Sequence, residues 1–175
     1  MGAGQFCTNP GIAIVTKGAE GDALVAAAKA ALSKVGPQVM LTDGIARAYQ
    51  DGRARFAGRN TVTELLGNDD TGRQASPNLF ETTTASFLQD HSLSEEVFGP
   101  LGLVIRVDGP EEMMTLARSF QGQLTSTIHM DAADAGFARR LLPVLERKAG
   151  RVLFNGFPTG VEVADSMVHG GPYPA

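Results

Sequence analysis

The sequence predicts an α/β protein with an open, largely parallel twisted sheet flanked by helices. Short apolar runs of strand length alternate with stretches whose apolar residues recur at helical spacing. The order strand, helix, strand, helix, strand in the second half requires crossover connections, which place strands parallel. Clusters of turn-forming residues separate the elements, and the chain has no internal repeat or low-complexity segment.

The first elements are a strand and a long helix. Asn9-Pro10-Gly11 is a turn signal, and the apolar residues 12–15 after it predict a strand. Residues 20–35 predict a helix, which Gly36-Pro37 ends. Its expected inward stripe is formed by Leu24, Ala28, Ala31 and Val35.

The middle of the chain predicts a helix, a loop and a strand. Residues 43–57 read as a helix with Ile45, Ala48 and Tyr49 on one side. Residues 67–78 are turn formers and predict a surface loop. Residues 79–88 mix threonines with phenylalanines, which favours an extended strand.

The second half predicts three strands and two helices. The strands are expected at 101–107, 124–130 and 151–154, where apolar residues dominate. Pro110 begins a helix that runs to Phe120. Asp131 is the expected N-cap of the second helix, which Pro143 should kink.

Composition indicates a globular chain of 175 residues, which we expect to form one domain over 1–175. The hydrophobic fraction is 43% and the charged fraction 19%, and no apolar run approaches the roughly 20 residues that a membrane span needs. The start has no signal-peptide features, so a cytoplasmic location is expected. A net charge of −4 argues against nucleic-acid binding, and the densest basic group, Arg53, Arg55 and Arg59, reads as a solvated helix face.

The single cysteine, Cys7, lies in Gly4-Gln5-Phe6-Cys7-Thr8-Asn9-Pro10. A cysteine before a turn, among small and polar residues, can be exposed enough for its thiolate to attack a carbonyl carbon. The residues alone equally allow a buried cysteine that acts as a small hydrophobic side chain.

Two further stretches carry residues suited to ligand binding. In Glu95-Glu96-Val97-Phe98-Gly99-Pro100, a carboxylate could accept two ribose hydroxyls, although the residues alone favour a solvated pair of glutamates at a helix end. The loop 155–163 and the segment 169–172 follow the last predicted strand, which is where open α/β sheets bind ligands. A surface loop of turn-forming residues without a ligand fits these residues equally. His91, His129 and His169 have no partners at metal-ligand spacing, so no metal site is predicted.

Together, in this order and spacing, these stretches resemble the aldehyde dehydrogenase superfamily. Gly4-Gln5-Phe6-Cys7 resembles the nucleophile segment of the family, and residues 95–100 resemble its Glu-Glu-x-Phe-Gly-Pro segment. Residues 152–156 resemble the strand and Asn-Gly turn near its C-terminal end. The resemblance covers essentially the whole chain, and it looks closest to the α-ketoglutarate semialdehyde (2,5-dioxovalerate) dehydrogenases.

The resemblance implies a function and a set of site residues. Cys7 would be the nucleophile, and an NADP or NAD cofactor would contact Glu96 through its ribose and Phe98 through its nicotinamide. The reaction would oxidise an aldehyde, expected to be 2,5-dioxopentanoate, to a carboxylate through a thiohemiacetal and a thioester. The substrate-binding residues would be Phe6, Asn155, Phe157, Thr159, Val161 and Gly170.

The resemblance also implies that much of such an enzyme lies outside this chain. The cofactor-binding domain of the family, its oxyanion asparagine and its hydrolytic glutamate precede the nucleophile, and its bridging C-terminal strand follows. We therefore expect a catalytic-domain fragment that is inactive alone and prone to self-association, from a homo-oligomeric enzyme that acts on a small aldehyde and binds neither nucleic acid nor membrane. The alternatives are a cysteine hydrolase or thioesterase, which needs a histidine near Cys7, and a non-catalytic binding module.

Overall fold

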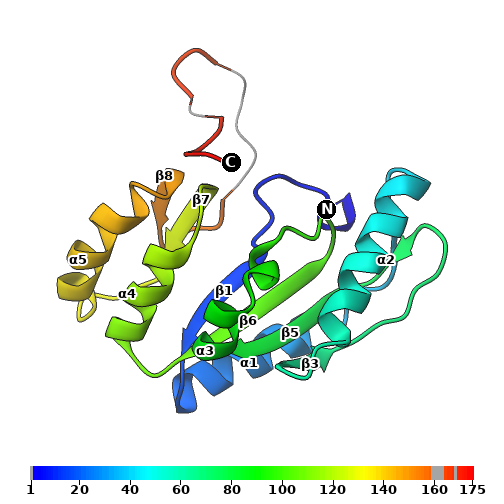
Figure 1. Cartoon of the computed structure of the whole chain (residues 1–175), viewed down its shortest axis with the longest axis horizontal. Coiled ribbons are helices and arrows are strands. Elements are labelled where there is room, and N and C mark those ends of the chain that lie inside the picture. Colours follow the sequence, from blue (N-terminus) through cyan, green and yellow to red (C-terminus); the bar gives the residue numbers. More distant parts are fainter. Residues whose placement is uncertain (1, 159–163, 168) are drawn as a thin grey trace. The chain divides into compact units, whose positions relative to one another are not determined.

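A computed structural model describes residues 2–158, 164–167 and 169–175. The chain divides into two compact units, Met1–Gly109 and Pro110–Ala175, which are described separately below (Figure 1). Both units combine helices with parallel strands, so the predicted α/β class is confirmed.

The first unit is built on a mostly parallel four-stranded sheet with the order β1-β6-β5-β3. Its strands are β1 (Ile12–Thr16), β3 (Val62–Leu66), β5 (Asn78–Thr83) and β6 (Leu101–Val107). β6 pairs in parallel with β1 on one side and with β5 on the other, while β3 pairs antiparallel with β5. β6 lies inside the sheet, and five of its seven residues, all except Gly102 and Arg106, are aliphatic, which suits a strand covered on both faces.

Helices cover both faces of this sheet. Val25 and Leu32 of α1 (Ala19–Leu32) pack against a cluster that includes Leu79 of β5. On the other face, the Phe56 ring of α2 (Asp43–Ala57) lies 5.6 Å, centroid to centroid, from Phe80. Consecutive strand residues point to opposite faces, so Leu79 and Phe80 place α1 and α2 on opposite sides, as Figure 1 shows.

Short elements complete the unit. The remaining elements are η1 (Gly2–Gly4), β2 (Gln38–Val39), β4 (Gln74–Ala75), α3 (Thr84–Gln89) and η2 (His91–Ser94), where η marks a 3-10 helix. β2 and β4 form an antiparallel pair, and α3 follows β5 directly.

Two predictions for the elements of this unit are wrong in detail. Leu24 and Val35 are 59% and 39% exposed, and the side of α1 that packs on the sheet carries the partly buried Val25 and Leu32 instead, because this alanine-rich helix has apolar residues on every side. Residues 84–89 are helical, since the Thr83 hydroxyl accepts the Ser86 N–H and begins a helix there.

The basic group on α2 is only partly a solvated face. The Arg53 and Arg59 side chains are 17% and 20% exposed, and both pair with acidic residues, whereas Arg55 is exposed. Fixed acidic partners on neighbouring segments explain why two of the three arginines are withdrawn from solvent.

The second unit contains a parallel strand pair covered by two helices. Its elements are α4 (Pro110–Ser119), β7 (Gln123–Ile128), α5 (Ala135–Leu145) and β8 (Ala149–Phe154). Met114 and Ala117 of α4 form a buried cluster with Leu141 and Leu145 of α5. The predicted cap is wrong: α5 begins at Ala135, and the Asp131 carboxylate instead accepts the Ala133 N–H in the preceding turn.

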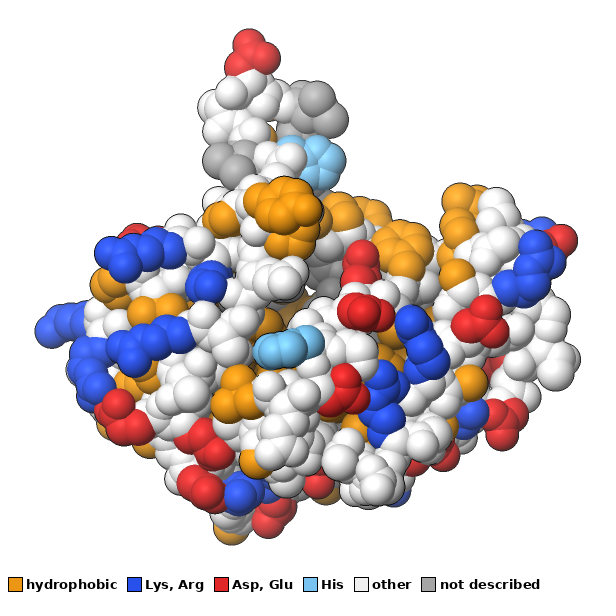
Figure 2. All heavy atoms as spheres, viewed as in Figure 1, with side chains coloured by type: hydrophobic (Ala, Val, Ile, Leu, Met, Phe, Trp, Pro, Cys, Tyr) orange, Lys and Arg blue, Asp and Glu red, His pale blue; other side chains and the backbone are white. Residues whose placement is uncertain are grey.

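The molecular surface mixes charges of both signs. Figure 2 shows acidic side chains beside basic ones across the face in view, and the net charge of the chain is −4. Within the described part of the chain, no helix has the length and apolar character to cross a membrane.

Candidate active site

Cys7 occupies an exposed turn in the first unit. The turn runs from Phe6 to Asn9 and is closed by the Asn9 N–H, which donates to the Phe6 carbonyl at 2.9 Å. The Cys7 side chain is exposed, and Phe6 before it is 54% exposed. Among the described residues, none accepts a hydrogen bond from the Cys7 or Thr8 N–H. The turn therefore presents a thiol together with unused backbone donors.

The turn is packed against the Glu-Glu-Val-Phe-Gly-Pro loop. Gly4 has φ +66°, and a Cβ at this position would lie 2.7 Å from the Gly99 carbonyl carbon and 2.8 Å from the Pro100 nitrogen. On the other side of the cysteine, the Asn9 Nδ2 donates to the Gly99 carbonyl at 3.3 Å. Two of the three motifs found in the sequence, 90 residues apart, are thus brought into contact.

The loop itself alternates between anchored and exposed residues. Val97 is half-buried and Gly99 is buried, while Glu95, Glu96 and Phe98 are exposed. The φ of Gly99 is +154°, and a Cβ there would lie 2.4 Å from the Tyr49 ring. Glycine is needed at this position, because a side chain would meet both a forbidden backbone region and a buried ring.

The two neighbouring glutamates have different surroundings. The Glu95 carboxylate pairs with Arg55 at 3.4 Å. The Glu96 carboxylate has no hydrogen bond or ion pair with the described residues. Glu96 is thus the carboxylate that remains available to a ligand. The sequence alone does not distinguish Glu96 from Glu95 in this respect.

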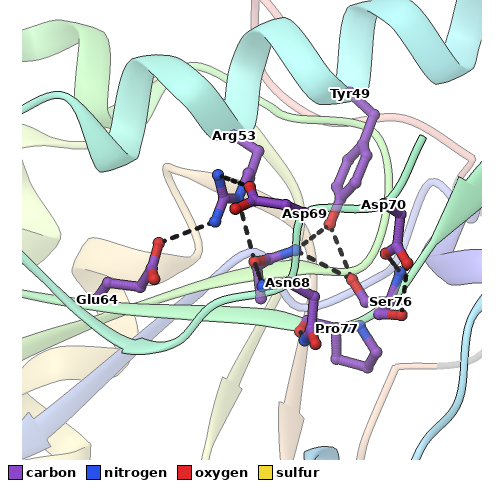
Figure 3. A network of polar contacts seen from close by, with 9 residues as sticks. Tyr49, Arg53, Glu64, Asn68, Asp69, Asp70, Ser76 and Pro77 are labelled. Carbon is purple, nitrogen blue, oxygen red and sulfur yellow. Dashed lines mark hydrogen bonds and ion pairs between the residues drawn. The ribbon is translucent and has the colours of Figure 1, made fainter.

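A polar network joins α2 to the segment 64–78, and its centre at Tyr49 and Asn78 is buried (Figure 3). The Tyr49 hydroxyl donates to the Ser76 carbonyl at 3.1 Å and accepts from Asn78 Nδ2 at 2.8 Å. Arg53, one turn along α2, pairs with Glu64 at 3.1 Å and with Asp69 at 2.5 Å. Burial raises the pKa of Tyr49 to about 12, against a smaller lowering by the Asn78 hydrogen bond.

A second network fixes the segment that leads into the loop. Arg59 Nε lies 2.7 Å from the Asp90 carboxylate, and its Nη2 donates to the Ser92 hydroxyl. The hydrogen bond from Ser92, followed by that from Arg59, lowers the pKa of the Asp90 carboxyl. These contacts hold η2, which ends just before Glu95.

The other predicted site residues lie in the second unit. Asn155 has φ +51°, and its Oδ1 accepts the Met130 N–H at 2.8 Å, so the side chain ties the end of β8 to the end of β7. Phe157 is 75% exposed, and its ring lies 5.1 Å from His129. Gly170 passes so close to β8 that a Cβ on Gly150 would lie 1.7 Å from its carbonyl oxygen.

Their assignment to substrate binding stays a prediction. Thr159 and Val161 lie outside the described residues. Within the described part of the chain, no group of three or more histidine, cysteine or acidic side chains could hold a metal ion. In the first unit, residues 2–109, no hydrogen bond joins Cys7 to His91, the only histidine there that a hydrolase could use.

Solved structures with a similar fold are aldehyde dehydrogenases. The fold is similar to that of lactaldehyde dehydrogenase from Escherichia coli, with a TM-score of 0.79, 21% identity, and coverage of 98% of this chain and 36% of that one. Aldehyde dehydrogenase 21 from Physcomitrella patens, solved with succinate, gives a TM-score of 0.78 at 21% identity, with coverage of 97% and 35%. The α/β fold is thus that of part of an aldehyde dehydrogenase.

Sequence comparison indicates particular relatives. The chain is 49% identical to α-ketoglutaric semialdehyde dehydrogenase 2 of Azospirillum brasilense, over 100% of its own length and 34% of that protein. It is 43% identical to α-ketoglutaric semialdehyde dehydrogenase of Acinetobacter baylyi, with the same coverage. No protein-family model matches. The resemblance predicted from the motifs is confirmed, and the chain spans about a third of the length of these curated relatives.

Proposed function

We propose that this chain supplies the nucleophile and the nicotinamide-side cofactor contacts of an NAD(P)-dependent aldehyde dehydrogenase. The proposed reaction oxidises 2,5-dioxopentanoate, the semialdehyde in the names of its relatives, to 2-oxoglutarate. One observation carries the proposal: an exposed cysteine turn is packed, through Gly4 and Asn9, against the loop that exposes Glu96 and Phe98. An attacking sulfur and a cofactor-holding loop must be neighbours for such a reaction.

Cys7 has the proposed role of nucleophile. Its thiolate adds to the aldehyde carbon, the carbonyl π electrons move to oxygen, and a tetrahedral thiohemiacetal oxyanion forms. The Cys7 N–H, which no described residue engages, is placed in the same turn and can donate to that oxyanion. A donor of this kind commonly stabilises the transition state by about 3 to 4 kcal/mol.

The residues of the exposed loop fit a dinucleotide. Glu96 has a carboxylate free of described partners that can accept two ribose hydroxyls, and Phe98, 38% exposed, offers a flat apolar surface to a nicotinamide ring. When bound, the nicotinamide would supply the hydride acceptor. Glu95 does not compete for this role, because Arg55 already pairs with it. The choice between NADP and NAD would rest on residues that contact the adenosine half, and the resemblance favours NADP.

We further propose that residues 1–175 act as catalytic-domain residues within a larger, homo-oligomeric enzyme. In relatives three times as long, most of the cofactor site and the hydrolytic glutamate would come from residues that have no counterpart here. The chain incubated alone with 2,5-dioxopentanoate and NADP should therefore give no NADPH. Steady NADPH production would contradict this part of the proposal.

A chimeric enzyme tests the proposed function. The corresponding third of the Azospirillum brasilense relative, 49% identical, is replaced by this chain. We expect the chimera to oxidise the semialdehyde, and Cys7→Ala to abolish that activity without changing its circular dichroism spectrum or oligomeric state. Activity that survives Cys7→Ala would contradict the proposal, as would a correctly assembled chimera that is inactive with Cys7 intact.

A further inference from the structure

Val97 separates the two residues proposed to hold the cofactor and points the other way. Glu96 and Phe98 are exposed, whereas Val97 between them is half-buried. Its side chain contacts Gly52 of α2, where a Cβ would lie 2.7 Å from Val97 Cγ1 and 2.9 Å from Cγ2. Val97, which lies between Glu96 and Phe98, thus packs the loop against α2.

Gly52 is an unfavourable residue at its place in α2. It lies inside a 15-residue helix, is buried, and its φ lies outside the range +20° to +160° that favours glycine. Glycine inside a helix destabilises it relative to alanine, since glycine loses more backbone freedom on folding. The close approach of Val97 explains why a larger residue does not fit here.

The same helix contacts the loop a second time. Tyr49, one turn before Gly52, lies under Gly99, so residues 97 and 99 both face α2 while 96 and 98 face away. Gly99 is in turn the residue against which Gly4 of the cysteine turn packs. The volume at position 52 therefore bears directly on where Glu96 and Phe98 lie relative to Cys7.

We propose that Gly52 is a positioning residue, which through Val97 sets the distance of Glu96 and Phe98 from the nucleophile. Naming these two as cofactor residues rests on the proposed function, but the positioning itself is a property of the fold. An added methyl group at position 52 would push Val97 outward, because helix backbone lies behind it. Removing the Val97 γ-methyl groups at the same time would give that methyl group room, since the nearest remaining atom would be Val97 Cβ at 3.4 Å, an ordinary van der Waals distance.

A spin label on the 175-residue chain tests this without aldehyde or cofactor. Cys7 is the only cysteine and is exposed, so a nitroxide can be attached there without engineering. The label enhances the relaxation of amide protons in proportion to the inverse sixth power of their distance. We expect Gly52→Ala to shift the enhancements at residues 96–98, and Gly52→Ala with Val97→Ala to return them toward the wild-type values.

Gly44 offers a matched control in the same helix. A Cβ at this position would have only the Thr42 hydroxyl within 4 Å, at 3.9 Å. Gly44→Ala, in the first turn of α2, should raise the folding equilibrium constant by at most about fivefold and leave the enhancements at 96–98 unchanged. Equal shifts in Gly44→Ala and Gly52→Ala, or none in Gly52→Ala, would overturn the proposal.

A second variant keeps the test decisive if Gly52→Ala does not fold. Val97→Ala removes the contact without overpacking and should release the loop, which would shift the enhancements at residues 96 and 98. Unchanged enhancements in Val97→Ala would also overturn the proposal. Because no cofactor is present, this outcome is independent of whether the chain serves an aldehyde dehydrogenase.

Discussion

Tyr49→Phe tests whether the buried hydroxyl network holds α2 under the active-site loop. The phenylalanine ring can keep the contact with Gly99, while the hydrogen bonds to the Ser76 carbonyl and from Asn78 are lost. Each such bond contributes about 1 kcal/mol net, so the free energy of unfolding at pH 7 should fall by about 2 kcal/mol.

The same substitution should change how stability depends on pH. The pKa of Tyr49 is raised from 10.0 to about 12 in the folded chain, mainly by burial. A raised pKa means that this contribution is fully present below pH 10 and is lost as the pH rises through 12. A rise of the Tyr49 pKa from 10.0 to about 12 corresponds to roughly 2.7 kcal/mol of unfolding free energy. The difference in unfolding free energy between the wild type and Tyr49→Phe should therefore shrink to about zero near pH 12.

Urea unfolding at several pH values, followed by far-ultraviolet circular dichroism, measures this difference. Absorbance of tyrosinate near 295 nm provides a second readout, because Tyr173 is the only other tyrosine and is 95% exposed. We expect Tyr49→Phe to remove a titration step near pH 12. A stability difference that stays constant from pH 7 to 12 would refute the assignment of a buried, hydrogen-bonded Tyr49.

Two further substitutions test the contact between the motifs and the distinction between the glutamates. Gly4→Ala should destabilise the chain by about 1 to 3 kcal/mol more than Gly2→Ala in urea unfolding, because both have positive φ but only Gly4 meets backbone atoms; equal losses would argue against the contact with Gly99. Glu96→Gln should weaken NADPH binding by the chimeric enzyme roughly tenfold, measured by NADPH fluorescence, while Glu95→Gln leaves it nearly unchanged. A larger effect of Glu95→Gln would reverse the assignment.

The strands with the strongest apolar character could be predicted from sequence. β6 has the predicted ends, 101 and 107, because an apolar run interrupted only by Arg106 and bounded by Pro100 and Asp108 favours a strand of that length. The inward side of α1 could not be predicted, because alanines occur on several faces of this helix and make those faces equally apolar. The helix at 84–89 was missed because a threonine-rich stretch favours a strand until Thr83 is recognised as a cap.

The sequence predicts the two motifs of the candidate site but not the residues of α2 on which the second motif packs. The sequence identifies the motifs that contain Cys7 and residues 96–98, and the structure packs Gly4 and Asn9, on either side of the cysteine, against Gly99. Tyr49 and Gly52 were not recognised, because their contacts with residues 97 and 99 join segments far apart in the chain. A glycine inside an otherwise regular helix was the available signal, since it costs stability unless close packing requires it.

The most direct test of the account is whether an aldehyde carbon bonds to the Cys7 sulfur. The chain is mixed with 2,5-dioxopentanoate labelled with ¹³C at its aldehyde carbon and followed by NMR. We predict a protein-bound thiohemiacetal resonance, distinct from the free aldehyde and its hydrate, that is absent from Cys7→Ser. No bound resonance with the wild-type chain, or the same resonance with Cys7→Ser, would contradict the central claim.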